Sequence, residues 1–266
     1  MTLPQTITFG DDRSVGSDVA WRWISAQNWP GWVVDVVRVT EPEPGVESLF
    51  THEPLHEEDP DDPRVAPKSS GISRVRHLTT AYDPRIVLNA KRDAQVMVVG
   101  ARGRGLLKSM RVGSTAEWLM RSPGTPLVVA RSDSAVRRIL VCIDGSAHAR
   151  AAVQALCALP WIPGREVTVL SVLDAATPSD GHARAAAAEL EAAGALTRTA
   201  VVDPDLTGVR PSPTYAILDQ IDALQPELVT LGTRGLTGLR RLAIGSVAGA
   251  VAHAAPCSVL LARDQE

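Results

Sequence analysis

The chain has 266 residues and a net charge of −3, with 45% hydrophobic and 21% charged residues. This length suits two domains of ordinary size, and the balance is that of a globular protein. The charged residues form no basic block, so we expect no nucleic-acid partner. The longest apolar runs are too short to cross a bilayer, and the one at residues 243–255 is broken by Gly245, Ser246 and His253. We therefore expect no membrane partner either.

The N-terminus and the cysteines bear on the cellular compartment. Residues 1–12 lack the cationic start and the apolar stretch of a signal peptide. Cys142, Cys157 and Cys257 form no C-x-x-C pair, which disfavours a disulfide framework and a zinc site. We interpret the cysteines as small core residues and expect a reducing, cytoplasmic location.

The first half of the chain alternates short β-branched runs with other patterns. The runs that we predict as buried strands are 7–9, 33–39, 74–78, 96–99 and 127–130. Between the second and third of these lies the stretch 41–70, which is rich in proline and acid (EPEPG, HEEDPDDPR). We interpret 41–70 as a long, largely irregular solvated loop with room for a helical turn.

The second half follows the same order. Its predicted strands are 138–143, 166–172, 198–202, 228–231 and 258–262. Its predicted helices are 147–159, 182–193, 212–224 and 245–254. Such alternation predicts an α/β fold, with a parallel sheet that has helices on both faces. The alanine-rich helix 182–193 has no counterpart in the first half, where the acidic stretch stands instead.

A shift of 132 residues superimposes the two halves. It places the first-half residues Asp12, Ser14, Gly100, Gly103, Gly113 and Ser114 on Asp144, Ser146, Gly232, Gly235, Gly245 and Ser246. A short polar stretch at 132–135 separates the copies. The repeat predicts two tandem domains, 1–134 and 135–266, each a five-stranded parallel sheet with helices on both faces.

A glycine-rich loop follows the fourth strand of each half. It reads G-x-x-G, nine further residues, and then G-S at the start of a helix. Glycine suits a backbone that turns with positive φ or that approaches an anion without a Cβ, and we expect the first two glycines to make a tight turn. The third begins a helix whose free N–H groups and dipole point toward a bound anion, with the serine hydroxyl as a further donor. The loop therefore predicts an anion-binding concavity at the carboxyl ends of the strands.

Other phosphate motifs do not fit these loops. A P-loop requires G-K-[ST] after four residues, and neither copy has it. Neither copy follows a first strand with an acidic residue about twenty positions on, so the dinucleotide fingerprint fails as well.

With these two loops, the chain resembles the universal stress protein family over almost its whole length. Residues 229–263 (VTLGTRGLTGLRRLAIGSVAGAVAHAAPCSVLLAR) are typical of the C-terminal half of that family. The resemblance implies ATP as the ligand, with or without Mg²⁺, in two Rossmann-like domains. It implies that Asp144 contacts the ribose and adenine side, with Val172 near the base through its backbone. The phosphate residues that it implies are Gly232, Gly235, Gly245, Ser246 and Val247, and the corresponding first-half residues are Asp12, Gly100, Gly103, Gly113, Ser114 and Thr115.

The first half departs from the family pattern in two places. Arg13 stands where the second half and the family have glycine, and the helix after the second strand is missing. ATP binding is therefore more strongly indicated for the second half. The resemblance also implies association through the last strands, here between the two halves of one chain, together with homodimers of whole chains.

Several of these residues have a second interpretation. Arg102 and Arg234 lie inside the loops, where they could bind phosphate as charged forks or remain solvated. Asp12 and Asp144 suit helix N-caps as well as a nucleotide. His52, His56, Glu57 and Glu58 have ligand chemistry, but they lie in a solvated acidic stretch, and we predict no metal site. The six tryptophans are interpreted as packing residues, with a surface patch for a partner as the minority alternative. These tryptophans are Trp21, Trp23, Trp29, Trp32, Trp118 and Trp161.

Three functions remain open at this stage. The first is a nucleotide-binding regulatory protein of the stress response, read by a protein partner that the sequence does not identify. The second is an interaction module of the same fold without ATP. The third is a slow ATPase or a nucleotidyl-transferase, which the sequence disfavours because it shows no G-x-S-x-G, H-E-x-x-H or H-x-G-H pattern and names no general base.

Overall fold

The structure is a computed structural model that describes residues 4–40, 54–102, 112–121, 123–173, 180–203, 212–235 and 244–264. The elements of the first half are β1 (Thr6–Gly10), α1 (Val15–Ser25), β2 (Val33–Thr40), β3 (His56–Glu57), β4 (Arg74–Ala81), α2 (Pro84–Ala90), β5 (Val96–Gly100), α3 (Ser114–Arg121) and β6 (Leu127–Ala130). Those of the second half are β7 (Arg138–Cys142), α4 (Ala147–Cys157), β8 (Glu166–Val172), α5 (Gly181–Ala192), β9 (Leu196–Val202), α6 (Pro213–Leu224), β10 (Leu228–Gly232), α7 (Ser246–Ala254) and β11 (Ser258–Ala262).

Each half contains the predicted five-stranded parallel sheet. The strand order is β4-β2-β1-β5-β6 in the first half and β11-β10-β7-β8-β9 in the second. In both halves the second strand pairs with one side of the first strand, and the fourth strand pairs with the other side. The first strand, β1 or β7, therefore lies between β2 and β5 or between β8 and β10. The carboxyl ends of β1 and β5, and of β7 and β10, therefore meet where the strand order reverses, which is where open α/β sheets bind ligands.

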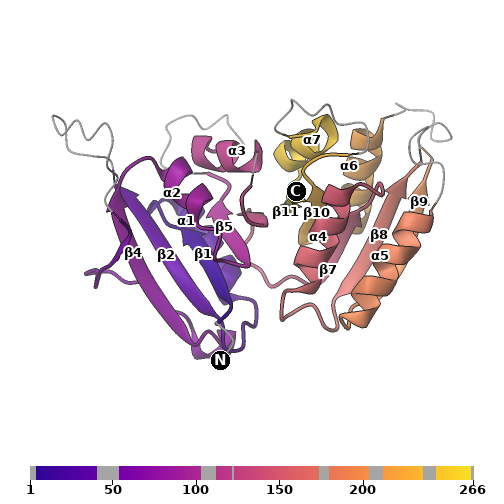
Figure 1. Cartoon of the computed structure of the whole chain (residues 1–266). Coiled ribbons are helices and arrows are strands. Elements are labelled where there is room, and N and C mark those ends of the chain that lie inside the picture. The colour runs from indigo at the N-terminus through magenta and orange to yellow at the C-terminus, as the bar shows by residue number, and fades with distance from the viewer. Residues whose placement is uncertain are drawn as a thin grey trace.

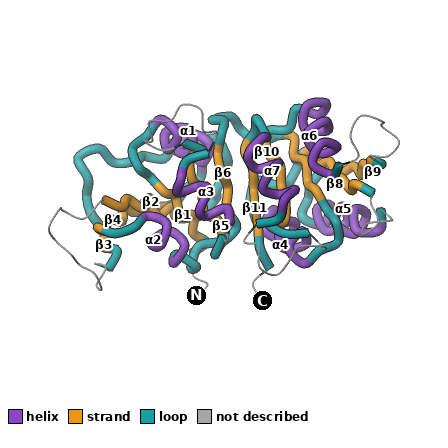
Figure 2. The backbone as a smooth tube through the Cα atoms, turned by 90° about the horizontal axis from the view of Figure 1, so that it is seen from above, coloured by secondary structure: helices purple, strands orange, loops and turns teal. Residues whose placement is uncertain are grey.

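The two halves join edge to edge. Strand β6 pairs antiparallel with β11, so that the described strands form one sheet of eleven (Figure 1; Figure 2). This confirms the expectation that the last strands of the two halves associate. The pairing closes one edge of each five-stranded sheet, an edge that would otherwise present free backbone N–H and C=O groups.

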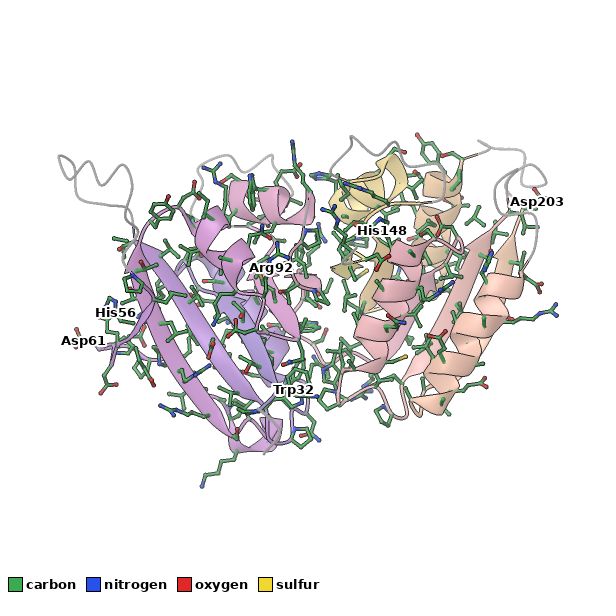
Figure 3. The ribbon with its side chains drawn as sticks, in the orientation of Figure 1. Trp32, His56, Asp61, Arg92, His148 and Asp203 are labelled. Atoms are coloured by element: carbon green, nitrogen blue, oxygen red, sulfur yellow. The ribbon has the colours of Figure 1, made fainter. Side chains whose placement is uncertain are left out.

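Tryptophans pack at the base of this junction. Trp23 and Trp29 of the first half contact Trp161 of the second, with ring centroids 6.0 and 5.9 Å apart in edge-on geometry. All three are almost fully buried, and Trp32 packs at a tilt against Trp29, at the end of the molecule opposite α3 and α7 (Figure 1; Figure 3). Such pairs stabilise a fold by about 0.5–1.5 kcal/mol beyond their buried area. The interpretation of these residues as core is thus confirmed.

The helices cover both faces of each sheet, as the sequence predicts. Helices α1, α4 and α5 pack into one hydrophobic cluster, whereas α2, α3, α6 and α7 pack into another. Figure 2 shows α1 and α2 on opposite sides of the first sheet. No helix in the described ranges is long and apolar enough to cross a membrane.

The acidic stretch is more ordered than predicted over residues 54–70. The short strand β3 pairs antiparallel with the edge strand β4, and a single helical turn forms at Lys68–Ser70. The helix that α5 provides in the second half is missing from these residues, as the sequence predicts. Residues 41–53 lie outside the described part of the chain. The description as a solvated loop is wrong for Arg64, whose side chain is only 16% exposed.

Arg64 is held by two carboxylates of the first half. Its guanidinium lies 2.9 Å from Oδ1 of Asp11 and 2.7 Å from Oδ1 of Asp18, with Arg38 as a second partner of Asp11 at 3.2 Å. It also lies 6.0 Å from the ring of Phe9. Burial alone would raise the pKa of Asp11, but the hydrogen bond and charge of Arg64 lower it to about 2. The stretch thus places a charged side chain beside the start of α1, between two carboxylates.

The backbone around Arg64 is tied down as well. Its N–H donates to Nε2 of His77 at 2.9 Å, which requires a neutral imidazole. Burial, and then the charge of Arg38, lower the pKa of His77 and favour that neutral form. Two residues earlier, Asp62 pairs with Arg13. The segment is therefore fixed to β1, β2 and β4 at once.

Replacing Arg64 by alanine should destabilise the first half. The change leaves the fully buried Asp11 carboxylate with Arg38 as its one ion-pair partner among the described residues, at an expected cost of about 2–4 kcal/mol in urea unfolding at pH 7 followed by tryptophan fluorescence. Because the pKa of folded Asp11 is about 2 against an ordinary 3.8, its contribution of about 2 kcal/mol is complete above pH 4 and is lost as the pH falls toward 2. The Arg64→Ala variant should therefore lose less stability on acidification than the parent.

The control for this experiment is Arg184→Ala. That guanidinium is 73% exposed and pairs with Asp180 on the surface of α5, so its loss should cost less than about 0.5 kcal/mol. Equal stability of the Arg64→Ala variant and the parent at pH 7 would contradict the role given to this ion pair.

Candidate functional site

The turn after the first strand of the second half connects three parts of the site. Oδ1 of Asp144 accepts the backbone N–H of Ser146 at 2.9 Å. The Ser146 hydroxyl accepts the N–H of Ala149 at 3.1 Å and so caps α4, while it donates to the carbonyl of Arg234 in the glycine loop at 3.1 Å. One serine thereby fixes the helix start and the loop relative to each other.

The first half repeats this arrangement bond for bond. Oδ1 of Asp12 accepts the N–H of Ser14 at 3.0 Å, and the Ser14 hydroxyl donates to the carbonyl of Arg102 at 3.2 Å. Arg13 takes a left-handed φ of 60°, matching the φ of 84° at Gly145 in the second half. The missing glycine has therefore not changed the turn, although a side chain is strained in this conformation.

The first glycine of each loop makes room for a helix. An ideal Cβ on Gly232 would lie 2.4 Å from the backbone nitrogen of Ala149, and one on Gly100 would lie 2.4 Å from the backbone of Gly16. In both halves, the last residue of the fourth strand thus touches the backbone of the first helix. No side chain fits between them.

Lack of space therefore explains the first glycine of each loop. Among the loop glycines that the structure describes, none has φ in the left-handed region, so of the two reasons considered for glycine, positive φ does not apply to them. These glycines are Gly100, Gly113, Gly232, Gly235 and Gly245. Gly103 lies outside the described residues.

The second glycine of the loop lies against the aspartate of the first strand. An ideal Cβ on Gly235 would stand 2.6 Å from Oδ2 of Asp144. The third glycine, Gly245, donates its N–H to the carbonyl of Thr233 at 2.7 Å, which brings the start of α7 back to the strand end. Gly113 does the same with Ala101 in the first half, also at 2.7 Å.

The other candidate residues lie at the same end of the sheet. Val172 ends β8, the strand next to β7, and is half-buried. Ser246 begins α7 and is exposed, with Val247 behind it packed on the core. In the first half, Ser114 is exposed and Thr115 half-buried at the start of α3. In Figure 1, α3 and α7 lie at the same end of the molecule.

The two loop arginines differ in their surroundings. Arg102 is exposed, whereas Arg234 is half-buried, and its Nε is buried without a hydrogen-bond partner in the described part of the chain. A buried guanidinium N–H without a partner costs free energy that an anion in the site would recover. This favours Arg234 over Arg102 as a phosphate ligand.

His148 is a neighbour of the site that the sequence did not single out as functional. Its Nδ1 accepts the N–H of Asp264 at 2.8 Å, which ties the start of α4 to the chain after β11 (Figure 3). Burial, and then the charges of Arg234 and Arg263, lower its pKa and hold the imidazole neutral. In the sequence, its proximity to the site could have been predicted only from its position four residues after Asp144.

Taken together, the second half offers backbone donors, one aspartate and one arginine around a strand crossover. Free N–H groups at the start of α7 and the Arg234 guanidinium suit phosphate, and the Asp144 carboxylate suits a hydroxyl or amino group. Within the described ranges, no group of three or more His, Cys, Asp or Glu could hold a metal ion, and His52 lies outside those ranges. The arrangement has the kinds of donor and acceptor that a nucleotide ligand would need, and within its described residues no nucleophile is hydrogen-bonded to a base.

Known proteins resemble this chain in sequence. The profile of the universal stress protein family matches residues 4–131 and 135–263. A universal stress protein of Mycolicibacterium smegmatis is 30% identical over 67% of this chain and 65% of its own length. One from Mycobacterium tuberculosis is 31% identical over 64% and 62%. The chain thus covers slightly less than two thirds of the length of these relatives.

The fold also has solved counterparts along the whole chain. A universal stress protein from Archaeoglobus fulgidus superposes with a TM-score of 0.68 and 16% identity, over 97% of this chain and 98% of its own. A functionally unknown protein from Pseudomonas aeruginosa superposes with a TM-score of 0.60 and 14% identity, over 98% and 92%. At this identity the likeness establishes the fold alone.

The close contact at Gly232 leads to a prediction about stability. In Gly232→Ala, the new Cβ would meet backbone atoms of α4 that cannot rotate away, and we expect a loss of about 1–3 kcal/mol in thermal unfolding. Gly249→Ala is the matched control, because this glycine is inside α7 with only Ile244 nearby at 3.7 Å, and alanine there should stabilise the helix by about 0.5–1 kcal/mol. If both variants melt like the parent, the glycine does not serve helix packing.

Proposed function

Because the chain belongs to the universal stress protein family, we propose that it is a nucleotide-binding stress protein whose ligand is ATP. The observation that carries this proposal is the contact between Asp144 and Gly235, with Ser146 bonded to the loop carbonyl between them. It brings an acceptor for the nucleoside and a loop for the phosphates to one strand crossover. The first half repeats the part of this arrangement that the structure describes, with the Ser14 hydroxyl bonded to the Arg102 carbonyl, and we propose a site in each half.

The role of each residue follows from its chemistry. We propose that Asp144 accepts hydrogen bonds from the ribose and adenine side and that the Val172 backbone lies near the base. Phosphate oxygens would be held by the N–H groups around Gly235 and Gly245, by the hydroxyl of Ser246 and by Arg234. Because Gly232 has no side chain, the loop can lie against the start of α4. Val247 supports the first turn of α7 by packing on the core. Asp12, Gly100, Arg102, Gly103, Gly113, Ser114 and Thr115 are the proposed first-half set.

Magnesium would enter with the triphosphate. This ion keeps several waters and is commonly held by the substrate phosphates, and we assign it no protein ligand. We assign no catalytic residue. Slow hydrolysis by an oriented water remains the alternative activity, and an interaction module without ATP is the alternative function.

The proposal extends to cellular context. We propose that nucleotide occupancy at the strand ends is read by a regulatory protein partner, that whole chains form homodimers, and that the protein acts in the cytoplasm. The domain boundary at residues 134 and 135 stays a prediction, and the short polar stretch before β7 supports it.

Millimolar ATP should stabilise the protein against heat. For a dissociation constant on the order of 10 μM and about 1 mM ATP, the ratio of roughly 100 adds about 2.7 kcal/mol to the stability of an occupied domain. The measurement is a melting curve with ATP and magnesium, and magnesium chloride at equal ionic strength is the control. A curve that ATP does not move would favour the module without ATP.

Gly235→Glu should abolish binding in the second half. The glutamate would enter the space beside Asp144 and oppose phosphate with a second negative charge. For a dissociation constant on the order of 10 μM, losing the site is a loss of about 7 kcal/mol of binding free energy. Equilibrium dialysis should then show one nucleotide fewer per chain, with circular dichroism as the folding control.

Ser246→Ala is the companion variant, with a smaller expected effect on ATP binding. It removes one hydroxyl among several donors and should weaken binding by about 1 kcal/mol, while the stoichiometry stays unchanged. A folded Gly235→Glu variant that binds as much ATP as the parent would show that the loop does not hold phosphate.

A further inference from the structure

The two halves fill one equivalent space in different ways. In the first half, the Arg64 guanidinium lies beside the start of α1, bonded to Asp11 and Asp18. The shift of 132 residues places Asp11 on Ile143 and Asp18 on Arg150. One acidic partner has thus become apolar in the second half, and the other has become a cation.

The second half has an open pocket in this place. Its volume is about 50 Å³, and it lies between α4 and α5. Side chains and backbone that line it include Ile143, Gly145, Arg150, Val153, His182 and Glu189. Since one water needs about 10–15 Å³ of such volume, the pocket can hold a group as large as a carboxylate or a phosphate but not a nucleotide.

Two basic side chains of the pocket, Arg150 and His182, are exposed. Neither Arg150 nor His182 has a side-chain hydrogen bond or ion pair with another described residue. Glu189 lies seven residues beyond His182, about 10 Å along α5, so its carboxylate lines the opposite end. The end formed by Arg150, His182 and the start of α4 carries the guanidinium charge of Arg150, which also supplies a fork of donors that suits oxyanions.

We propose that this pocket is a second ligand site, specific for a small oxyanion such as a carboxylate or a phosphate group. The anion binds to Arg150 and His182 over the apolar floor of Ile143 and Val153. The first half needs no such ligand, because its own Arg64 fills the equivalent space. There a cation lies between two carboxylates, whereas in the second half an anion would lie beside two basic side chains.

The pocket lies behind the turn of the proposed nucleotide site. An ideal Cβ on Gly145 would lie 2.4 Å from the His182 ring, so this ring rests directly on the turn that carries Asp144. A ligand at His182 thus touches the reverse side of residues 143–146. An effect of the anion on nucleotide binding rests on the proposed function, because it requires a nucleotide at Asp144. Binding of the anion itself does not depend on the proposed function.

The test is a titration of the full chain with sodium acetate and, separately, sodium phosphate up to 50 mM. The signal is the His182 ring resonance in NMR, assigned by its loss in His182→Gln. The experiment uses the Gly235→Glu background, so that phosphate bound at the glycine loop does not contribute. We expect a saturating shift with acetate, phosphate or both, and the two arms tell which oxyanion is preferred. In Arg150→Ala the affinity should fall at least tenfold.

Two controls make the result decisive. Arg184→Ala removes an exposed α5 arginine that does not line the pocket and should leave the titration unchanged. Sodium chloride at equal ionic strength should give no saturating shift. The proposal is overturned if neither oxyanion shifts His182, if chloride shifts it equally, or if Arg150→Ala binds as the parent does. Each outcome is independent of whether the parent chain binds ATP.

Discussion

The structure of the site depends on the contact between the end of the fourth strand and the backbone of the first helix. Gly232 and Gly100 allow this contact, because any side chain there would overlap backbone atoms at about 2.4 Å. Only at this distance can the Ser146 and Ser14 hydroxyls cap their helices and also reach the carbonyls of the loops. The position of the loop, and with it the proposed phosphate site, follows from how closely two backbones approach.

The second organising feature is the pairing of β6 with β11. Through this pairing, each five-stranded sheet covers the free edge of the other. The tryptophans at the base of the junction pack against each other across it. The two proposed nucleotide sites therefore belong to one continuous sheet. A change that disturbs this pairing would reach both halves.

The halves have diverged most where the acidic stretch replaces α5. In the first half, a buried guanidinium holds the segment to two carboxylates, and burial makes these charges costly to separate. In the second half, α5 follows β8 instead, and a small pocket between α4 and α5 contains Arg150 and His182. The turns at Asp12 and Asp144 match, whereas the structure around them differs, and we propose the oxyanion site for the second half alone.

The sequence by itself determined the elements and the repeat. The β-branched runs predicted β8 and β11 to the residue, and the shift of 132 residues paired Asp12 with Asp144 and Ser14 with Ser146, whose hydrogen bonds are now seen to match. These features are local or periodic, so they can be found in a single chain.

Only the tertiary structure decided why the loop glycines are needed and what the acidic stretch does. At Gly100 and Gly232 φ is not left-handed, and the atoms that exclude a Cβ come from a helix more than eighty residues away in the chain. Arg64 looked like one charge in a solvated loop, since nothing near it in sequence shows that it meets Asp11 and Asp18. Contacts between residues far apart in the chain depend on how the strands are ordered in the sheet. No local sequence pattern encodes that order.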